Sequence, residues 1–444
     1  MKLITPPLII EEGTDFEKDL FDRKNFGHSL ANIIKQCQDP LVIGLDGNWG
    51  EGKTTFIQMW KGLLKKEQIH SIYIDAFAND HTDDAFIVVA SAIHDYVQSH
   101  ADTSTTTTLI EKIKKTGVKL IPWTAKLALK AASIGIIKDA DFDEFKEIAE
   151  SVSSDISETA ENLIHEKLVS HKQNVQTIES FKEFLSTLPS LLNKPDTTLP
   201  LTIIIDELDR CRPSFAIELL EKIKHLFSVP NVVFVLVMNK QQLEESIRSM
   251  YGANIDAHTY LQKFITIEAQ LPKQQDKYNS DIGKYCERLH YLHELEVNSY
   301  FITPTMKALG EHFNLTLRQL EKIYSNLTLA YGSSRSPNNQ DHALLAFGAT
   351  LKVIHTKLFK SLNYREISYD ELCIAINYRA DDKDDERVDL YNLMMHVKYC
   401  VISDQEYADL KEDRELRRFE VFGRTTRYHT LLRAFYPLTL FNQN

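Results

Sequence analysis

One glycine-rich stretch near the start of the chain constrains the fold most. The apolar run of residues 41–46, Leu-Val-Ile-Gly-Leu-Asp, leads into residues 47–55, which read Gly-Asn-Trp-Gly-Glu-Gly-Lys-Thr-Thr. This order predicts a buried strand, a tight glycine turn and a helix that opens at Lys53. The backbone N–H groups of such a turn and the N-terminus of the helix together surround an anion. The stretch therefore predicts a cradle for the phosphates of a nucleoside triphosphate.

The residue types of this stretch each have a place in such a cradle. We expect the three glycines to turn the backbone with positive φ, Lys53 to span the β- and γ-phosphates, and the Thr54 hydroxyl to hold Mg²⁺. The expected nucleotide-binding residues are Gly47, Asn48, Trp49, Gly50, Glu51, Gly52, Lys53, Thr54 and Thr55. The alternative, a glycine-rich surface turn, is disfavoured because a strand precedes the turn and a helix follows it.

A second apolar run ends in acidic residues. Residues 201–205, Leu-Thr-Ile-Ile-Ile, predict a strand that is buried on both faces, and Asp206 and Glu207 follow directly. We expect Asp206 to hold Mg²⁺ opposite Thr54, and Glu207 to orient or deprotonate the attacking water. Adjacent acids at the end of a buried strand are costly without a cation, which disfavours a purely structural role.

Three further polar residues are candidates for completing the site. The apolar run 232–238 predicts another strand, and it ends at Asn239. This side chain is predicted either to contact the γ-phosphate or the attacking water, or to cap the helix that opens at Lys240. Arg210 and Arg318 are candidates for the guanidinium that stabilises charge on the phosphate in the transition state. A surface salt bridge explains either arginine equally well.

The length of 444 residues predicts two or three domains. Residues 21–99 and 197–275 show the strand and helix signals of an α/β domain in two halves, with a parallel sheet. A helical insertion over residues 100–196 separates the halves. Residues 1–20 form an N-terminal segment, and residues 276–444, where helical periodicity prevails, are expected to form a lid and a mostly helical C-terminal domain.

Composition limits the partners and the compartment. The formal net charge of −12 gives no support for a large nucleic-acid surface. Near the C-terminus, arginines alternate with aromatic residues, which predicts either a nucleic-acid contact or an amphipathic final helix, and we favour the helix. Five cysteines without a paired spacing, and an N-terminus without a secretory signal, favour a cytoplasmic protein.

Residues 118–137 form an apolar stretch that is long enough to span a membrane as a helix. Lys119, Lys126 and Lys130 interrupt it, so a transmembrane helix is disfavoured. A basic amphipathic helix that lies on a membrane surface is one alternative. A solvated helix with one buried face is the other, and this composition is more typical of it.

Four sequence blocks together resemble the KAP family of P-loop NTPases. The Trp-Gly pair at residues 49–50 lies inside the P-loop as it does in the family. Asp75-Ala76-Phe77 is similar to the family's Asn-Ala-Trp. Residues 205–211 are similar to its Asp-Asp-Leu-Asp-Arg block, with Glu207 as a departure. Residues 260–265, with Leu271-Pro272, are similar to its Tyr-Leu-Glu-Lys-Ile block before Leu-Pro. The similarity covers residues 20 to 330 approximately.

The resemblance implies an α/β P-loop NTPase fold of the ASCE type, akin to AAA+ proteins, with Arg318 as a sensor arginine of the lid. It also implies that ATP hydrolysis with Mg²⁺ resets a conformational switch in a homo-oligomer. The family is known for membrane-linked signalling scaffolds in animals and for phage exclusion in bacteria. Since no ankyrin array is evident, the bacterial kind is the nearer comparison, and a separate effector protein is an expected partner.

Two other functions stay open at this point. The first is a nucleotide-gated scaffold that binds ATP without hydrolysing it. The second is a P-loop phosphotransferase, for which no acceptor-binding motif is evident in the sequence. ATP is the default nucleotide, and the sequence does not separate it from GTP.

Overall fold

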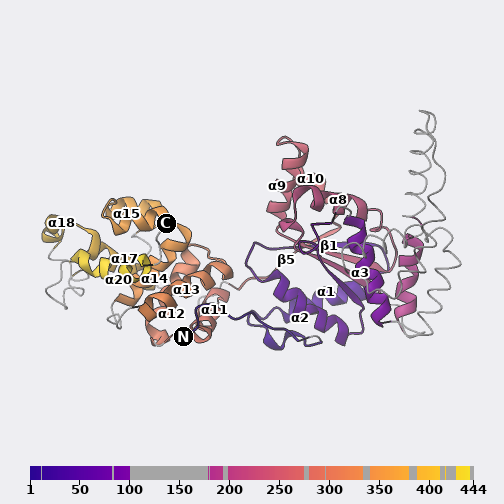
Figure 1. Cartoon of the computed structure of the whole chain (residues 1–444), viewed down its shortest axis with the longest axis horizontal. Coiled ribbons are helices and arrows are strands. Elements are labelled where there is room, and N and C mark those ends of the chain that lie inside the picture. Colours follow the sequence, from indigo (N-terminus) through magenta and orange to yellow (C-terminus); the bar gives the residue numbers. More distant parts are fainter. Residues whose placement is uncertain are drawn as a thin grey trace, which may run out of the picture.

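The computed structural model of the chain describes residues 1–11, 13–82, 85–100, 179, 181–193, 199–274, 280–295, 297–333, 341–379, 388–410, 416 and 427–440. These residues form two lobes that lie side by side, one built on a sheet and one made of helices (Figure 1). The predictions for residues 118–137, and for most of the insertion at 100–196, lie outside the described residues. The last described part of that insertion, residues 181–192, is helical as its periodicity predicts.

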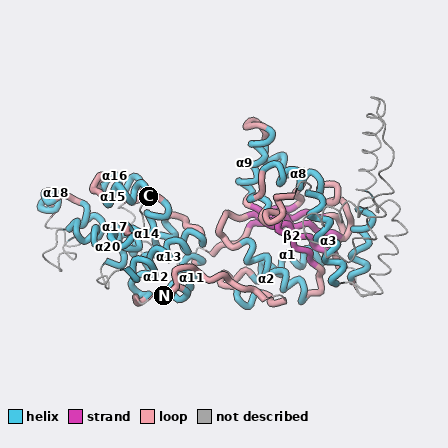
Figure 2. The backbone as a smooth tube through the Cα atoms, viewed as in Figure 1, coloured by secondary structure: helices cyan, strands magenta, loops and turns pink. Residues whose placement is uncertain are grey.

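A sheet of five parallel strands, in the order β2-β3-β4-β1-β5, forms the first lobe (Figure 2). The strands are β1 (Leu41–Asp46), β2 (Ser71–Asp75), β3 (Leu201–Asp206), β4 (Val232–Met238) and β5 (Ile267–Gln270). Every residue of β3 and β4 is buried, as their β-branched runs predict for central strands. The sequence does not predict β5, which is four residues long and largely exposed at the sheet edge.

Alternate residues of the central strands point to two separate cores. Val233, Val235 and Val237 of β4 pack on one face with helices α1 (Lys24–Gln36) and α2 (Lys53–Lys66). Phe234 and Leu236 face the opposite way, toward α3 (Ala85–His100), α8 (Pro213–Ile223) and the helical residues 181–192. Two further helices, α9 (Lys240–Tyr251) and α10 (Ala257–Gln262), complete this lobe.

The second lobe packs its helices around a third core. Its described helices are α11 (Asp281–Leu292), α12 (Ser299–His312), α13 (Leu317–Ser333), α14 (Asp341–Ile354), α15 (Thr356–Asn363), α16 (Tyr369–Ala375), α17 (Val388–Val401), α18 (Asp404–Asp409) and α20 (Arg427–Thr439). In α20, Tyr428 and Phe435 are buried in this core, which agrees with the expectation of an amphipathic final helix. None of the described helices combines the length and the apolar character needed to cross a membrane.

The N-terminal segment runs from one lobe to the other. The amino group of Met1 pairs with Glu294, and the backbone of Lys2 donates to His293, so the chain begins against the helical lobe (Figure 1). The segment then crosses to the sheet lobe. A Cβ added to Gly62 of α2 would lie only 1.8 Å from the carbonyl oxygen of Thr14 in this segment. Glycine at position 62 is therefore required for the close approach of the segment to α2.

We expect Gly62→Ala to lower the free energy of unfolding by about 3 kcal/mol, because backbone must move to admit the methyl group. Alanine is a better helix former than glycine by about 1 kcal/mol, so helix propensity alone predicts that the substitution raises the free energy of unfolding. The steric effect predicts that it lowers it. Urea denaturation measures the difference, with Ser29→Ala on the exposed face of α1 as a control that changes stability by about 0.5 kcal/mol or less. A Gly62→Ala variant as stable as the wild type would contradict this packing.

Candidate functional site

The glycine-rich loop follows β1 at the carboxyl edge of the sheet. Gly50 and Gly52 have φ values of +77° and +84°, which confirms the prediction of positive φ for these two residues. The same prediction is wrong for Gly47, whose φ is not positive. A Cβ at Gly47 would instead meet Cγ of Lys53 at 3.3 Å. The absence of a side chain at position 47 therefore leaves room for the Lys53 side chain, which folds against the loop there.

Lys53 begins α2 and turns back into the loop. Its side chain is buried, and Nζ donates to the carbonyl oxygens of Gly47 at 2.6 Å and Asn48 at 3.3 Å. Burial lowers the pKa of the ammonium, and the nearby carboxylates, that of Asp209 most, oppose this shift. The positive charge therefore lies on the inner side of the loop, near the N-terminus of α2, where an anion is favoured. Thr54 and Thr55 follow in the first turn of the same helix.

Asp206 ends β3 and is completely buried. Its Oδ1 accepts a hydrogen bond from the backbone N–H of Glu207 at 2.8 Å, and its Oδ2 accepts one from the Tyr73 hydroxyl at 3.2 Å. Burial raises the pKa of Asp206 to about 6. The carboxylate is thus fixed in orientation, and its charge is costly in the absence of a cation. Sequence reasoning missed Tyr73, whose contact depends on the pairing of β2 with β3.

Glu207 has a left-handed backbone, with φ at +62°. Its Oε1 accepts a hydrogen bond from the Thr54 hydroxyl at 3.0 Å, and its Oε2 pairs with the guanidinium of Arg210. The structure therefore brings together three residues that were predicted separately, one from the loop after β1 and two from the acidic block after β3. Their catalytic roles stay predictions.

The two remaining candidates lie at helix starts. Asn239 is buried, and its side-chain oxygen accepts a hydrogen bond from the Gln242 backbone at 3.2 Å, so it caps α9. This is one of the two roles predicted for it, and a contact with phosphate stays a prediction. Arg318 lies in the first turn of α13, where the preceding residue, Leu317, donates its N–H to the carbonyl oxygen of Gly50 at 3.0 Å. Helix α13 therefore begins directly on the loop, and we use the word lid below for the helical lobe of which it is part, as the sequence predicts.

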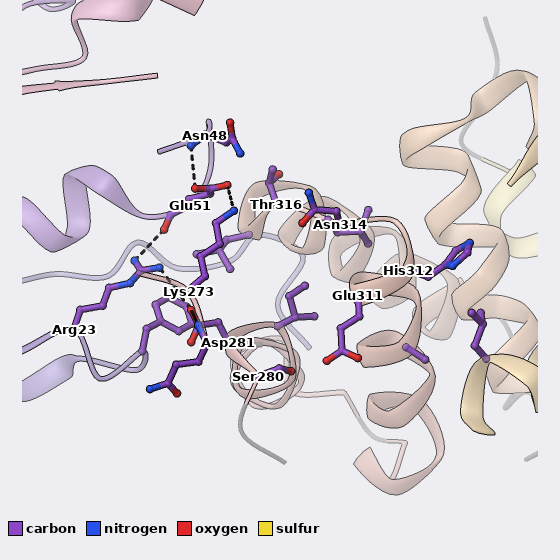
Figure 3. A pocket seen from close by; sticks show the side chains of 17 residues that line it. Arg23, Asn48, Glu51, Lys273, Ser280, Asp281, Glu311, His312, Asn314 and Thr316 are labelled. Carbon is purple, nitrogen blue, oxygen red and sulfur yellow. Dashed lines mark hydrogen bonds and ion pairs between the residues drawn. The ribbon is translucent and has the colours of Figure 1, made fainter. Parts of the chain in front are cut away.

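A second link between loop and lid runs through Arg23 (Figure 3). This side chain is 4% exposed, and it donates to the carbonyl oxygens of Glu51 at 3.0 Å and Pro272 at 3.2 Å. It also pairs with Asp281 of α11 at 3.7 Å. The Glu51 side chain in turn accepts from the backbone N–H of Asn48 at 2.9 Å and pairs with Lys273 at 2.5 Å. Sequence reasoning missed this network, because its members are distant in the chain.

A cavity of about 410 Å³ lies beside this network, between the loop and the lid. Asn48, Glu51 and Lys273 line it from the sheet lobe, and Glu311 and Thr316 line it from the helical lobe (Figure 3). The outer face of the loop and the start of the lid thus share one solvent-accessible space.

Comparison with known proteins gives one family match. The profile of the KAP family P-loop domain matches residues 23–333. No curated protein matches the sequence significantly.

Solved structures give weaker likenesses. The ORC2 protein of Aeropyrum pernix, in its ADPNP–ADP complexes, is 14% identical, with 98% of this chain and 87% of that chain covered and a TM-score of 0.37. The AMPPCP-bound DnaA of Aquifex aeolicus is 13% identical, with 98% and 96% covered and a TM-score of 0.31. TM-scores below 0.5 do not establish a shared fold, so the fold is assigned from the parallel sheet and the family match.

We expect Arg23→Met to lower the free energy of unfolding by about 3 kcal/mol, because it leaves the Asp281 carboxylate buried and unpaired. In the same background, Asp281→Asn should recover about 1 kcal/mol of that loss. Urea denaturation compares these variants with Arg248→Met, which removes a surface pair with Glu244 and Glu245 and should cost about 1 kcal/mol or less. Equal losses for the Arg23 and Arg248 variants would contradict the buried network.

Proposed function

The chain belongs to the KAP family of P-loop domains, and on that premise we propose that it binds ATP and hydrolyses it with Mg²⁺ as a conformational switch. One observation carries the proposal: the hydroxyl of Thr54, in the first turn of α2 directly after the glycine-rich loop, lies 3.0 Å from the carboxylate of Glu207, in the acidic block. The groups expected to hold phosphate, cation and water therefore meet at one edge of the sheet. We propose ATP rather than GTP as the default nucleotide.

The loop and the start of α2 supply the phosphate site. Backbone N–H groups of residues 47–54 and the ammonium of Lys53 neutralise the phosphate oxygens in this proposal. The Thr54 hydroxyl and the Asp206 carboxylate would hold Mg²⁺. The fit is good because Mg²⁺ takes oxygen ligands and commonly one or two carboxylates, and because the fully buried Asp206 requires a compensating charge. When bound, Mg²⁺ neutralises charge that develops on the phosphate oxygens.

Glu207 is the proposed general base. Water attacks the γ-phosphorus, the bond to the bridging oxygen breaks, and the Glu207 carboxylate accepts the proton of the water. Both of its oxygens already accept a contact, from Thr54 and from Arg210, so the water either uses a remaining lone pair of the carboxylate or replaces one of these contacts. A guanidinium, that of Arg210 or Arg318, stabilises the transition state, and Asn239 contacts the γ-phosphate or the water.

The contact between loop and lid supports the proposed switch. A change in the loop on hydrolysis alters the hydrogen bond from Leu317 to Gly50 and so reaches α13 and the helical lobe. We further propose, on family membership alone, that the chain self-associates and passes its signal to a separate effector protein. The free cysteines of the described chain support action in the cytoplasm.

The biological task that we propose is anti-phage defence or signalling in a prokaryote, and it rests on the family resemblance. Phage plating on a host that carries the wild-type chain in its native gene context, beside Lys53→Ala, tests it. Protection that depends on Lys53 supports the task. Equal plating on both hosts contradicts it.

A second candidate function is a nucleotide-gated scaffold without turnover. The paired state of Glu207 favours it, because Arg210 and Thr54 compete with a water molecule for the oxygens of this carboxylate. In this function, bound ATP orders the loop and the lid and is released intact.

We expect Glu207→Gln to bind ATP as tightly as the wild type and to lose turnover by about 100-fold or more, because the amide cannot act as a base. Lys53→Ala should lose both binding and turnover. Calorimetry with a non-hydrolysable analogue and a phosphate-release assay separate the two effects, and Glu245→Gln on the exposed face of α9 is the matched control. Equal turnover in Glu207→Gln and wild type contradicts the role of Glu207. Tight binding by a wild type without turnover supports the scaffold.

A further inference from the structure

The acidic block contains a carboxylate that neither the cation nor the proton transfer uses. Asp209 lies in η3 (Leu208–Arg210), two residues beyond Glu207, and it is 7% exposed. Its Oδ2 accepts a hydrogen bond from the indole nitrogen of Trp49 in the glycine-rich loop. Its Oδ1 is buried and has no hydrogen-bond partner among the residues that the structure describes. A buried carboxylate with one unsatisfied oxygen is costly, so its position calls for a functional explanation.

The backbone that carries Asp209 is held rigidly. The η3 turn packs against β4, α8 and α9, and its first residue, Leu208, is completely buried in the core of the sheet lobe. Asp209 therefore offers a fixed acceptor at the carboxyl edge of the sheet. It also lies beside the glycine-rich loop, because its Oδ2 accepts the hydrogen bond from the Trp49 indole.

The backbone that carries Trp49, in contrast, lies in a glycine-rich loop. The residue lies between Gly47 and Gly50 in a loop that contains three glycines, and it is 42% exposed. Glycines give such a loop many backbone conformations, and fixing one of them costs entropy when a ligand binds. A hydrogen bond from the indole to a fixed carboxylate orders the crest of the loop beforehand, which lowers that cost.

We propose that Asp209 is a positioning residue of the nucleotide site: it holds Trp49 and so keeps the loop of residues 47–52 in its phosphate-binding conformation. The inference rests on the proposed function. The bond joins the phosphate-binding loop to the acidic block at a point beside, and separate from, the Thr54–Glu207 contact. Two residues that the sequence places in different motifs thus act as one unit.

The experiment is a double-mutant cycle on the full chain, read as affinity for Mg·ADP by calorimetry. Trp49→Phe keeps the ring and removes the donor, and Asp209→Ala removes the acceptor. Each single variant should bind Mg·ADP about tenfold more weakly than the wild type, as expected for the loss of a hydrogen bond to a charged group. The affinity of the double variant should lie within about twofold of the affinity of either single variant. Asp209→Asn keeps an acceptor oxygen and should bind within about threefold of the wild type.

Controls separate positioning from stability. Circular dichroism and the thermal midpoint show whether each variant is folded. Tyr251→Phe, at the C-terminal end of α9, removes a hydroxyl that donates to Glu221 at 2.7 Å, and it should bind like the wild type. If Asp209→Ala fails to fold, the affinity of Trp49→Phe for Mg·ADP tests the positioning role instead, since the exposed ring of Trp49 contributes little to the core.

The outcomes distinguish the two levels of the proposal. Binding that is lost in Lys53→Ala but unchanged in Trp49→Phe and Asp209→Ala overturns the role of Asp209 and leaves the proposed function intact. Losses that add fully in the double variant overturn it too, because the two side chains would then act independently. A wild type without affinity for Mg·ADP overturns the proposed function and, with it, this role.

Discussion

The hydrogen bond from the Thr54 hydroxyl to the Glu207 carboxylate, 3.0 Å long, is the contact on which the rest of the site depends. It joins the loop after β1 to the acidic block after β3, two strands that are separated in the sheet by β4. Parallel strands place their carboxyl ends at one edge, so the strand order alone brings these motifs together. The fully buried β3 and β4 make that edge rigid, because their side chains fill cores on both faces.

The sequence allows the strands with strong apolar runs, the glycine-rich loop and the acidic block to be predicted, because each depends on neighbouring residues. It does not predict β5, since four exposed edge residues carry little hydrophobic signal. It also misses contacts that depend on register or on tertiary packing: the hydroxyl of Tyr73 on Asp206, and the guanidinium of Arg23 on the loop. The prediction of positive φ for Gly47 is wrong because a glycine that leaves room for the Lys53 side chain looks the same in sequence as one that adopts positive φ.

Residues of both lobes hold the glycine-rich loop in place. Arg23 and Glu51 fix its outer face, and the N–H of Leu317 fixes Gly50 at its crest. All of these contacts are at or near the interface with the helical lobe, and Arg23 also pairs with Asp281 of that lobe. In the proposed switch, a nucleotide that changes the loop would disturb these contacts, and they would connect the two lobes.

A crystal structure with a non-hydrolysable ATP analogue and Mn²⁺, whose anomalous signal locates the ion, tests the central claim most directly. We expect the phosphates within residues 47–54 and the ion between Thr54 and Asp206. We also expect the Glu207 carboxylate to face the γ-phosphate. A nucleotide bound elsewhere, for example in the cavity between the loop and the lid, with no ion near Asp206, would contradict it.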